Sequence, residues 1–407
     1  MNSQGSPLVR GARSAVIVEA VRSPMGKGKM GGALSSLHAV ELLGQVIAGL
    51  MDRVDLDPAL VDDVLVGCVT QVGEQSACPG RLAWLGAGLP ESVPATTIDR
   101  RCGSGQQAAH FAAQGIIAGA YDVAVVAGVE SMSRVPMGSG RMGQDGHGPS
   151  AEARYAPGLV SQGVAAELVA ADWGISREEL DAYAAESHRR AAQTADSGGF
   201  DAEIVPVTVP GEDGPRAVTA DESIRRGTTA ERLAQLTPSF HTDAAAERFP
   251  EIDWSVTPGN SSQLTDGAAA LLVVEEDLAD RLGLRARARF TSFSVMGADP
   301  IRMLTAPIPA TRQALDRARL SLDDIDVAEV NEAFASVPLA WQRELDYPSE
   351  RLNPRGGAIA LGHPLGASGA RIMATMLHHL EQTGGRFGLQ TMCEGSGMAN
   401  ATILERL

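Results

Sequence analysis

The chain has 407 residues, with 34 basic against 50 acidic side chains and a formal net charge of −16. Hydrophobic residues make up 44% and charged residues 21%, as in folded globular proteins and unlike disordered or fibrous chains. Nucleic acid and anionic membranes are disfavoured as partners, because both are bound through clustered Lys and Arg. The length allows two or three domains of ordinary size.

Targeting and redox signals are sparse. Apolar stretches are interrupted before the ~20 residues that a membrane span needs, and Met1–Arg13 lacks the apolar core of a secretory signal. We therefore expect a cytoplasmic protein with no membrane partner. The four cysteines, Cys68, Cys78, Cys102 and Cys393, are too few for a disulfide scaffold and lack metal-ligand spacing. The chain has no P-loop and no His-x-x-x-His pair, so no metal and no nucleotide hydrolysis are expected.

Short apolar runs and helical stretches alternate along the chain. Residues 15–19, 64–68 and 122–128 are rich in β-branched side chains and predict buried strands. Helices are predicted over 106–120 and 310–319. This alternation indicates an α/β fold with mostly parallel, buried sheets.

The two halves of the chain share a local pattern. Cys102-Gly-Ser-Gly leads into a predicted helix and then a strand over 123–128. Gly366-Ala-Ser-Gly likewise leads into a helix over 371–381 and a strand over 387–392. Two copies of one α/β unit would explain the pattern, and chance similarity is the alternative.

Residues 137–256 have a different character. They are rich in polar helix formers and loop residues, and Ser176 followed by Glu179 forms a capping box that predicts the start of a helix. We interpret this stretch as an inserted lid or ligand-binding segment. A structural insertion on one face of a single domain is the alternative.

Cys102 is a candidate nucleophile. It lies in a glycine-rich turn immediately before a predicted helix, where the helix dipole and unpaired N–H groups lower the pKa of a thiol. Glycines beside it would let a substrate carbonyl approach closely. The alternative is a small apolar side chain that fills the turn.

Three residues of the C-terminal part are further candidates. His363 stands between glycine and proline in a turn, where a histidine can act as a general base. Cys393 follows the last predicted strand in a glycine-rich segment and could serve as an acid or base. Asn331 ends a predicted strand, and ligands of open α/β sheets bind at such ends. Purely structural roles remain open for all three.

Five separated motifs resemble those of the thiolase family, and they occur in the family's order across nearly the whole chain. They are Arg101-Cys-Gly-Ser-Gly105, Gly128-Val-Glu-Ser-Met-Ser-Arg134, Gly259-Asn-Ser-Ser-Gln-Leu-Thr-Asp-Gly-Ala-Ala-Ala270, Asn331-Glu-Ala-Phe-Ala335 with Gly357-Ala-Ile-Ala-Leu-Gly-His-Pro-Leu-Gly366, and Cys393-Glu-Gly-Ser-Gly397. The resemblance implies an α/β thiolase fold with two duplicated αβαβα halves, a five-layered core and an inserted loop domain. The implied parts are an N-terminal half over 1–136, a loop domain over 137–256, a return to the N-terminal half over 257–285 and a C-terminal half over 286–407.

The resemblance also implies roles for the candidate residues. Cys102 would take the acyl group as a thioester after activation by His363. Cys393 would exchange a proton with the acetyl-CoA carbon or with the incoming CoA thiol. One oxyanion site would combine His363 with a water held by Asn331, and the other would use the backbone N–H groups of Cys102 and Gly395.

Binding residues follow from the same resemblance. Ser262 would contact the pantetheine of coenzyme A, and Arg225 would lie near its nucleotide end. Phe334 and Met303 would line the acyl pocket. Coenzyme A is then a co-substrate and no cofactor is held permanently, and a homotetramer or homodimer is expected, with residues 131–155 as a candidate oligomerisation or covering loop.

Departures from the family pattern bear on the substrate. Ser161-Gln-Gly163 stands where members specialised for acetoacetyl-CoA commonly have His-Met-Gly, and Gln263 replaces a frequent glycine. We therefore favour a degradative 3-oxoacyl-CoA thiolase with a longer or bulkier acyl group over an acetoacetyl-CoA-forming acetyltransferase. A decarboxylating ketosynthase, which would carry one Cys and two His, and a non-catalytic CoA- or lipid-binding relative are the remaining alternatives.

Overall fold

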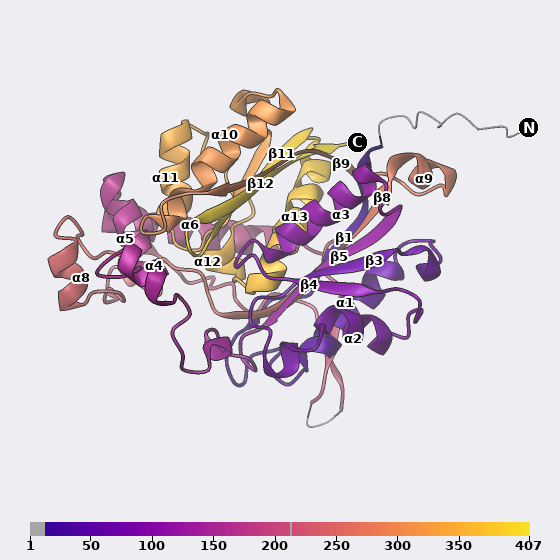
Figure 1. The fold of residues 1–407 in the computed structure, drawn as a ribbon, viewed down its shortest axis with the longest axis horizontal. Coiled ribbons are helices and arrows are strands. Elements are labelled where there is room, and N and C mark those ends of the chain that lie inside the picture. Colours follow the sequence, from indigo (N-terminus) through magenta and orange to yellow (C-terminus); the bar gives the residue numbers. More distant parts are fainter. Residues whose placement is uncertain (1–12, 212–213) are drawn as a thin grey trace, which may run out of the picture.

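The computed structural model describes residues 13–211 and 214–407. We expect no secretory signal in Met1–Arg13. Residues 1–12 of this segment lie outside the described residues. Figure 1 shows the N-terminal part of the chain (indigo) and the C-terminal part (orange to yellow) as two sheet-and-helix units that meet along the helices α3 and α13.

One β-sheet runs through both units in the order β10-β11-β12-β9-β1-β8-β5-β3-β4, and a short strand, β2, pairs with β8. The N-terminal unit contributes β1 (Ala15–Arg22), β2 (Gly26–Lys27), β3 (Asp63–Gly67), β4 (Ala95–Ile98), β5 (Val123–Ser131) and β8 (Thr265–Glu275). The C-terminal unit contributes β9 (Ala288–Gly297), β10 (Val327–Val330), β11 (Phe387–Glu394) and β12 (Met398–Arg406). The predicted strands are therefore present.

The prediction of mostly parallel pairing is wrong. Only β3 with β4, β3 with β5, and β10 with β11 run parallel, and every other pair of the sheet is antiparallel. The cause is the return of the chain: β8 re-enters the sheet after the long inserted segment and runs against both β5 and β1. Strands buried on both faces have the same apolar composition in either direction, so composition does not distinguish the two cases.

The two units repeat one topology. The order β1-β8-β5-β3-β4 in the first corresponds to β9-β12-β11-β10 in the second, and an isolated parallel bridge from Ala328 to Leu352 stands where β4 would be. Each unit places one helix, α3 or α13, before the strand β5 or β11. The expected duplication is confirmed.

Helices complete a five-layered arrangement (Figure 1). The outer layers are α1 (Ala39–Met51) with α2 (Pro79–Gly86), and α10 (Pro307–Ala318) with α11 (Ser336–Leu345); the middle layer is α3 (Ser104–Ala118) with α13 (Leu365–Thr383). The middle helices pack on strands of both units through a shared core of small and flexible apolar side chains, including Ala108, Ala112, Met373 and Met376. Separate apolar clusters join each outer layer to its own strands.

The two middle helices touch backbone to backbone. A β-carbon on Gly369 would lie 2.1 Å from the backbone nitrogen of Gln106, and one on Gly105 would lie 2.8 Å from the carbonyl oxygen of Gly366. A β-carbon on Gly366 would also meet the carbonyl oxygen of Gly67 at 2.5 Å. Glycine is therefore required at these contacts, which bring the first turns of α3 and α13 together.

The segment between β5 and β8 forms its own small elements. They are α4 (Pro149–Arg154), α5 (Gln162–Asp172), α6 (Arg177–Asp196), β6 (Val207–Val209), β7 (Arg216–Val218), α7 (Ala230–Leu233) and α8 (Asp243–Arg248). The predicted capping box at Ser176 and Glu179 is present at the start of α6. α6 packs against α12 (Ala358–Leu361) of the C-terminal unit, whereas β6 packs against α1. The remaining helix, α9 (Glu276–Arg281), follows β8.

A buried ionic group ties this segment to β1. The guanidinium of Arg22 is fully buried and lies 2.5 Å from the carboxylate of Glu203 and 2.7 Å from that of Asp221. Two carboxylates compensate the buried charge and raise the pKa of Arg22 despite the cost of burial. Loss of either carboxylate would leave a charge poorly compensated in the core.

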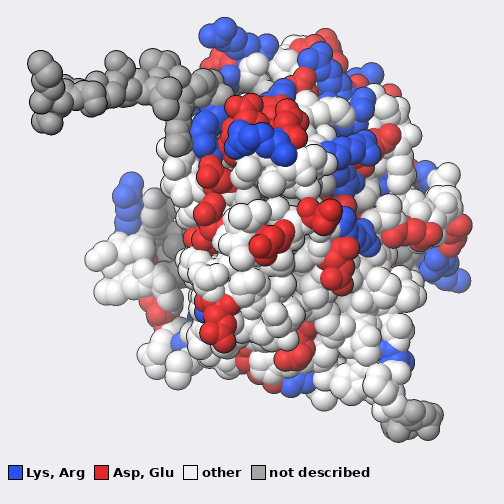
Figure 2. Space-filling model, turned by 90° about the vertical axis from the view of Figure 1, so that its right-hand side faces the viewer, with Lys and Arg blue, Asp and Glu red and all other residues white. Residues whose placement is uncertain are grey.

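On the face drawn in Figure 2, acidic and basic side chains lie next to one another around a broad uncharged area. Ion pairs such as Arg386 with Glu405 at 2.7 Å offset surface charges locally. Within the described part of the chain, no helix combines the length and the apolar character that crossing a bilayer requires.

Candidate active site

The four residues singled out for chemistry lie at the ends of elements that meet in the middle of the molecule. Cys102 precedes the first residues of α3, Cys393 is near the end of β11, Asn331 follows β10, and His363 lies between α12 and α13. All four are at most 5% exposed. The Cys102 thiol lies close enough to Cys393 for their charges to interact, and it receives the backbone N–H of Gly395.

The prediction that the pKa of Cys102 is lowered is wrong. Burial raises the pKa of this thiol well above its ordinary value, and the neighbouring Cys393 and Glu394 raise it further. The N–H groups of Cys102 and Gly395 act in the opposite direction without reversing the shift. Desolvation therefore outweighs the helix terminus and keeps Cys102 as a thiol, so a nucleophilic role for Cys102 would require a base.

Hydrogen bonds hold the His363 side chain in one orientation and one tautomer. Its Nδ1 lies 2.6 Å from the hydroxyl oxygen of Ser368, and this hydroxyl donates its own hydrogen to the carbonyl of Pro364 at 2.9 Å. The histidine Nδ1–H must then be the donor, which leaves Nε2 as the acceptor nitrogen of the ring. Burial, with a contribution from Arg371, lowers the pKa of His363 to about 3, so the imidazole is neutral.

The turn before His363 is fixed by the strand that returns from the inserted segment. The backbone N–H of His363 donates to the carbonyl of Gln263 at 3.1 Å and to the hydroxyl of Thr265 at 3.0 Å. Gly362 has φ +91°, and a β-carbon there would lie 2.1 Å from the Thr265 hydroxyl. Only glycine fits this close turn, which sets the direction of the imidazole.

Asn331 links the histidine to the second cysteine. Its amide nitrogen lies 3.5 Å from Nε2 of His363. Burial raises the pKa of Cys393 to about 12, and contacts with the Asn331 side chain and the N–H of Ala333 moderate the increase. The side-chain oxygen of Asn331 is buried and has no hydrogen-bond partner among the described residues, which leaves it able to accept from a ligand.

Sequence analysis missed two acidic residues. Glu394 is fully buried, and burial raises the pKa of its carboxyl to about 8. A β-carbon on Gly103 would lie 1.9 Å from its Oε1, so Glu394 fills the space between the nucleophile turn and β11. The only sequence signal was an acidic residue directly after Cys393.

The second missed residue is Glu332. Its carboxylate accepts hydrogen bonds from the hydroxyl of Tyr183 at 3.0 Å, the hydroxyl of Ser187 at 2.7 Å and the backbone N–H of Ile359 at 3.0 Å. The residue next to Asn331 thus joins β10 to α6 and to α12, which precedes His363. Its charge beside Asn331 was visible in the sequence, but its distant partners were not.

The two residues expected to contact coenzyme A lie on either side of Gln263. Arg225 is exposed and donates to the side-chain oxygen of Gln263 at 3.1 Å. Ser262 is half-buried, and its backbone N–H donates to the carbonyl of Ala333 at 2.9 Å. Arg226 pairs with Asp196 at 2.6 Å, so its charge is offset within the protein.

The expected acyl-pocket residues are apolar and buried. Phe334 and Met303 belong to one hydrophobic cluster together with Cys393. The ring of Phe240, from the inserted segment, packs edge to face on Phe334 with centroids 5.9 Å apart. Cys393 therefore lies in the same apolar cluster as the aromatic side chains of Phe334 and Phe240.

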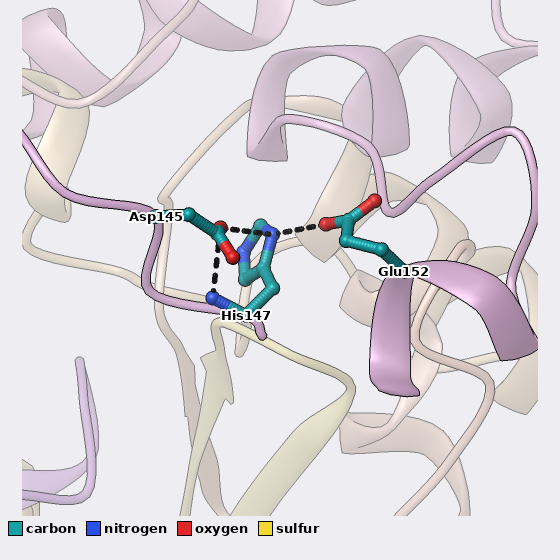
Figure 3. Close-up of side chains that lie close together, drawn as sticks. All are labelled: Asp145, His147 and Glu152. Carbon is teal, nitrogen blue, oxygen red and sulfur yellow. Dashed lines mark hydrogen bonds and ion pairs between the residues drawn. The ribbon is translucent and has the colours of Figure 1, made fainter. Parts of the chain in front are cut away.

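The loop over 131–155 carries three side chains close enough together to hold a metal ion: Asp145, His147 and Glu152 (Figure 3). The carboxylate of Asp145 accepts the backbone N–H of His147 at 3.0 Å and of Gly148 at 2.7 Å. Nδ1 of His147 lies 2.7 Å from Glu152, which comes from α4. These contacts hold the loop against α4.

Two sequence profiles of known protein domains match nearly all of the described chain. The sequence profile of the thiolase N-terminal domain matches residues 15–277, and that of the thiolase C-terminal domain matches residues 284–406. The steroid 3-ketoacyl-CoA thiolase FadA6 of Mycobacterium tuberculosis is 46% identical over 416 aligned residues, covering 99% of this chain and 98% of that protein. A 3-ketoacyl-CoA thiolase of Erwinia tasmaniensis is 46% identical over 397 residues, 96% of this chain and 99% of the relative.

A solved structure gives the same result. The crystal structure of the Bacillus anthracis acetyl-CoA acetyltransferase superposes with a TM-score of 0.87 at 38% sequence identity, over 97% of this chain and 99% of that one. The fold and the matches define an acyltransferase with a duplicated, five-layered α/β core. The chain belongs to the thiolase family.

Proposed function

We propose that this protein is a 3-oxoacyl-CoA thiolase, which cleaves a 3-oxoacyl-CoA with coenzyme A to give acetyl-CoA and a shortened acyl-CoA. The observation that carries the proposal is the convergence of a buried Cys102 thiol, a neutral His363 and a second buried thiol, Cys393, in one site. The names of the relatives, 3-ketoacyl-CoA thiolases, support the same reaction.

In the first half-reaction, Nε2 of His363 takes the proton of the Cys102 thiol as sulfur attacks the 3-oxo carbon. The bond between carbons 2 and 3 of the substrate breaks, and its electron pair remains on carbon 2. Cys393 protonates that carbon, which gives acetyl-CoA and leaves the acyl group on Cys102. In this scheme His363, together with a water held by Asn331, stabilises the thioester oxygen that gains charge when this bond breaks.

In the second half-reaction, the Cys393 thiolate takes the proton of the incoming CoA thiol. The CoA sulfur attacks the acyl-Cys102 thioester, and the N–H groups of Cys102 and Gly395 stabilise the oxyanion. When the thioester breaks, the Cys102 sulfur recovers its proton from His363. The two half-reactions share a covalent intermediate, so ping-pong kinetics follow.

Arg225 and Ser262 are proposed to bind coenzyme A, and Phe334 with Met303 to enclose the acyl group. We further propose the division into 1–136, 137–256, 257–285 and 286–407, a homodimer or homotetramer, and a cytoplasmic location. Coenzyme A is the co-substrate of this scheme. The buried aromatic wall favours an acyl group longer or bulkier than acetyl, working in the degradative direction.

One alternative has a specific observation in its favour. The structural relative from Bacillus anthracis is named an acetyl-CoA acetyltransferase, and the same site can run the reaction as a condensation of two acetyl-CoA molecules. Activity confined to acetoacetyl-CoA would favour this alternative.

The test is CoA-dependent cleavage of a 3-oxoacyl-CoA series, from acetoacetyl-CoA upward in chain length, followed by loss of the enolate absorbance. We expect preference for longer or bulkier members, no turnover by Cys102→Ala, and acylation without turnover by Cys393→Ala. Cys78→Ala, which lies outside the site, is the matched control and should remain active. Normal turnover by Cys393→Ala would contradict its acid-base role, and absence of cleavage by the wild type would contradict the function.

A further inference from the structure

The amide side chain of Gln162 reaches the loop between β11 and β12. Gln162 is the first residue of α5, whose start is capped by the hydroxyl of Ser161. A β-carbon placed on Gly395 would lie 3.0 Å from Nε2 of Gln162. Gly395 is the residue whose N–H points to the Cys102 thiol, so this amide lies beside one of the two proposed oxyanion donors. Figure 1 shows α5 beyond the ends of β11 and β12 that this loop connects.

The surface next to Gln162 is aromatic. Gly163 follows it, and a β-carbon there would lie 2.2 Å from the ring of Phe240, so only glycine lets this ring pack directly on the start of α5. Phe240 in turn packs on Phe334. Gln162 thus lies next to an aromatic pair, Phe240 and Phe334, of which Phe334 is proposed to enclose the acyl group.

That amide is not used by the protein. Within residues 13–211 and 214–407, the side chain of Gln162 has no hydrogen-bond partner, and it is only half-buried. An acyl chain laid over it would remove its water. A purely hydrocarbon chain would give nothing in return, whereas an oxygen atom on the chain would accept the amide hydrogen.

A second donor, Arg101, belongs to the turn before Cys102. A β-carbon on Gly395 would lie 3.8 Å from Cγ of Arg101, whose guanidinium is partly exposed. Asp99 lies 3.6 Å from this guanidinium and offsets part of its charge. Among the described residues, Asp99 is the carboxylate paired with Arg101, so the charge of this guanidinium is only partly offset.

We propose that Gln162 is a specificity-determining residue that selects 3-oxoacyl-CoA substrates whose acyl chain carries an additional oxygen atom, as a ketone, hydroxyl or carboxylate. The inference rests on the proposed thiolase function and narrows its substrate class. The shared chemistry is a hydrogen-bond acceptor on the part of the chain that stays on Cys102. The amide is partly open to water, so water competes for this hydrogen bond. We therefore expect kcat/KM for oxygenated substrates to exceed that for hydrocarbon ones by about 3- to 10-fold.

The test compares substrates of equal chain length. 3-Oxooctanoyl-CoA is the hydrocarbon reference, 3,7-dioxooctanoyl-CoA carries a neutral acceptor, and 3-oxooctanedioyl-CoA carries a carboxylate. The wild type should have the higher kcat/KM for at least one oxygenated substrate. Gln162→Met, which keeps the length and removes the amide, should reduce the ratio of oxygenated to hydrocarbon kcat/KM by about 3- to 10-fold.

Further variants make the result specific. Gln235→Met changes an exposed glutamine outside the site and should leave the ratio unchanged. Gln162→Glu places only acceptors at this position and should lower the ratio for both oxygenated substrates, which keeps the inference testable if the methionine variant folds poorly. If Arg101→Gln lowered kcat/KM only for 3-oxooctanedioyl-CoA, we would infer that Arg101, together with Gln162, binds the substrate carboxylate.

Two results would overturn the inference. One is equal kcat/KM for all three substrates in the wild type, and the other is an unchanged ratio in both Gln162 variants. In either case 3-oxooctanoyl-CoA would still be cleaved and the thiolase function would stand. Absence of cleavage of every substrate would instead reject the proposed function itself.

Discussion

Replacing Glu394 with glutamine should remove a loss of stability that the wild type suffers at alkaline pH. The carboxyl is fully buried against Gly103, and burial raises its pKa from 4.5 to about 8. Arg100 acts against this shift without cancelling it. The folded state therefore holds the proton more tightly than the unfolded state. Its contribution to stability is fully present below pH 4.5 and is lost as the pH rises through about 8.

The size of the effect follows from the two pKa values. The gap between 4.5 and about 8 corresponds to about 5 kcal/mol in full, of which about 3 kcal/mol is lost between pH 6 and pH 9. Glutamine has nearly the same shape and carries no proton to lose. The free energy of unfolding of Glu394→Gln should therefore gain about 3 kcal/mol relative to the wild type over this interval.

Urea unfolding of both proteins at pH 6, 7.5 and 9 measures this difference. All other titrating groups are common to the two proteins, so their contributions cancel in the comparison. Glu247→Gln, an exposed position, is the matched control and should follow the wild type at every pH. If Glu394→Gln and the wild type lost stability in parallel, Glu394 would be ionised in the folded protein, and the burial argument would be refuted.

Two further predictions concern α13 and its first turns. Gly366→Ala forces a β-carbon to within 2.5 Å of the Gly67 carbonyl oxygen and 2.6 Å of Cys68 Cα. Because backbone atoms cannot move aside, we expect a loss of at least the 1–3 kcal/mol typical of overpacking, about 3 kcal/mol or more, in thermal unfolding. Gly86→Ala, whose β-carbon meets nothing within 4 Å, is the control, and equal stability of the two would contradict the contact. Ser368→Ala removes the acceptor of the His363 Nδ1–H and should lower kcat by about 10- to 100-fold with little change in KM, whereas Ser368→Thr should restore most of the rate. An unchanged rate of acyl-enzyme formation in Ser368→Ala would show that the serine does not set the tautomer.

The sequence predicted the elements of the fold better than their pairing. Strands such as 64–68 and 122–128 were recognisable because their apolar runs are short and lie between turn residues. The direction of β8 was not recognisable, because it depends on how the long segment after β5 returns to the sheet. The duplicated unit was visible because Cys102-Gly-Ser-Gly and Gly366-Ala-Ser-Gly begin corresponding helices.

The site was predicted in part. Glycine-rich turns marked Cys102, His363 and Cys393, and the structure brings their elements together at one place. The roles assigned to them remain predictions. The shift of the Cys102 pKa had the wrong sign because the helix terminus is a local feature, whereas desolvation depends on segments distant in sequence.

Gln162 illustrates what sequence reasoning could not reach. The departure at Ser161-Gln-Gly163 was evident, but nothing in the chain near it indicated that its amide meets Gly395. The same holds for Gln263, whose side chain donates to the carbonyls of Ser223 and Ile359 and so joins the inserted segment to the turn before His363. Such contacts arise from packing between parts of the chain that are far apart in sequence.

The glycine contacts between α3 and α13 also limit how the two repeats can diverge. A larger side chain on the shared face of one helix, at Gly105 for example, would require the backbone of the other helix to move away. No single substitution moves a helix backbone in this way. The outer faces of the two units are under no such mutual restriction. We therefore expect likeness between the halves at the start of these helices, where Cys102 and Gly366 hold corresponding positions, and divergence on the outer faces.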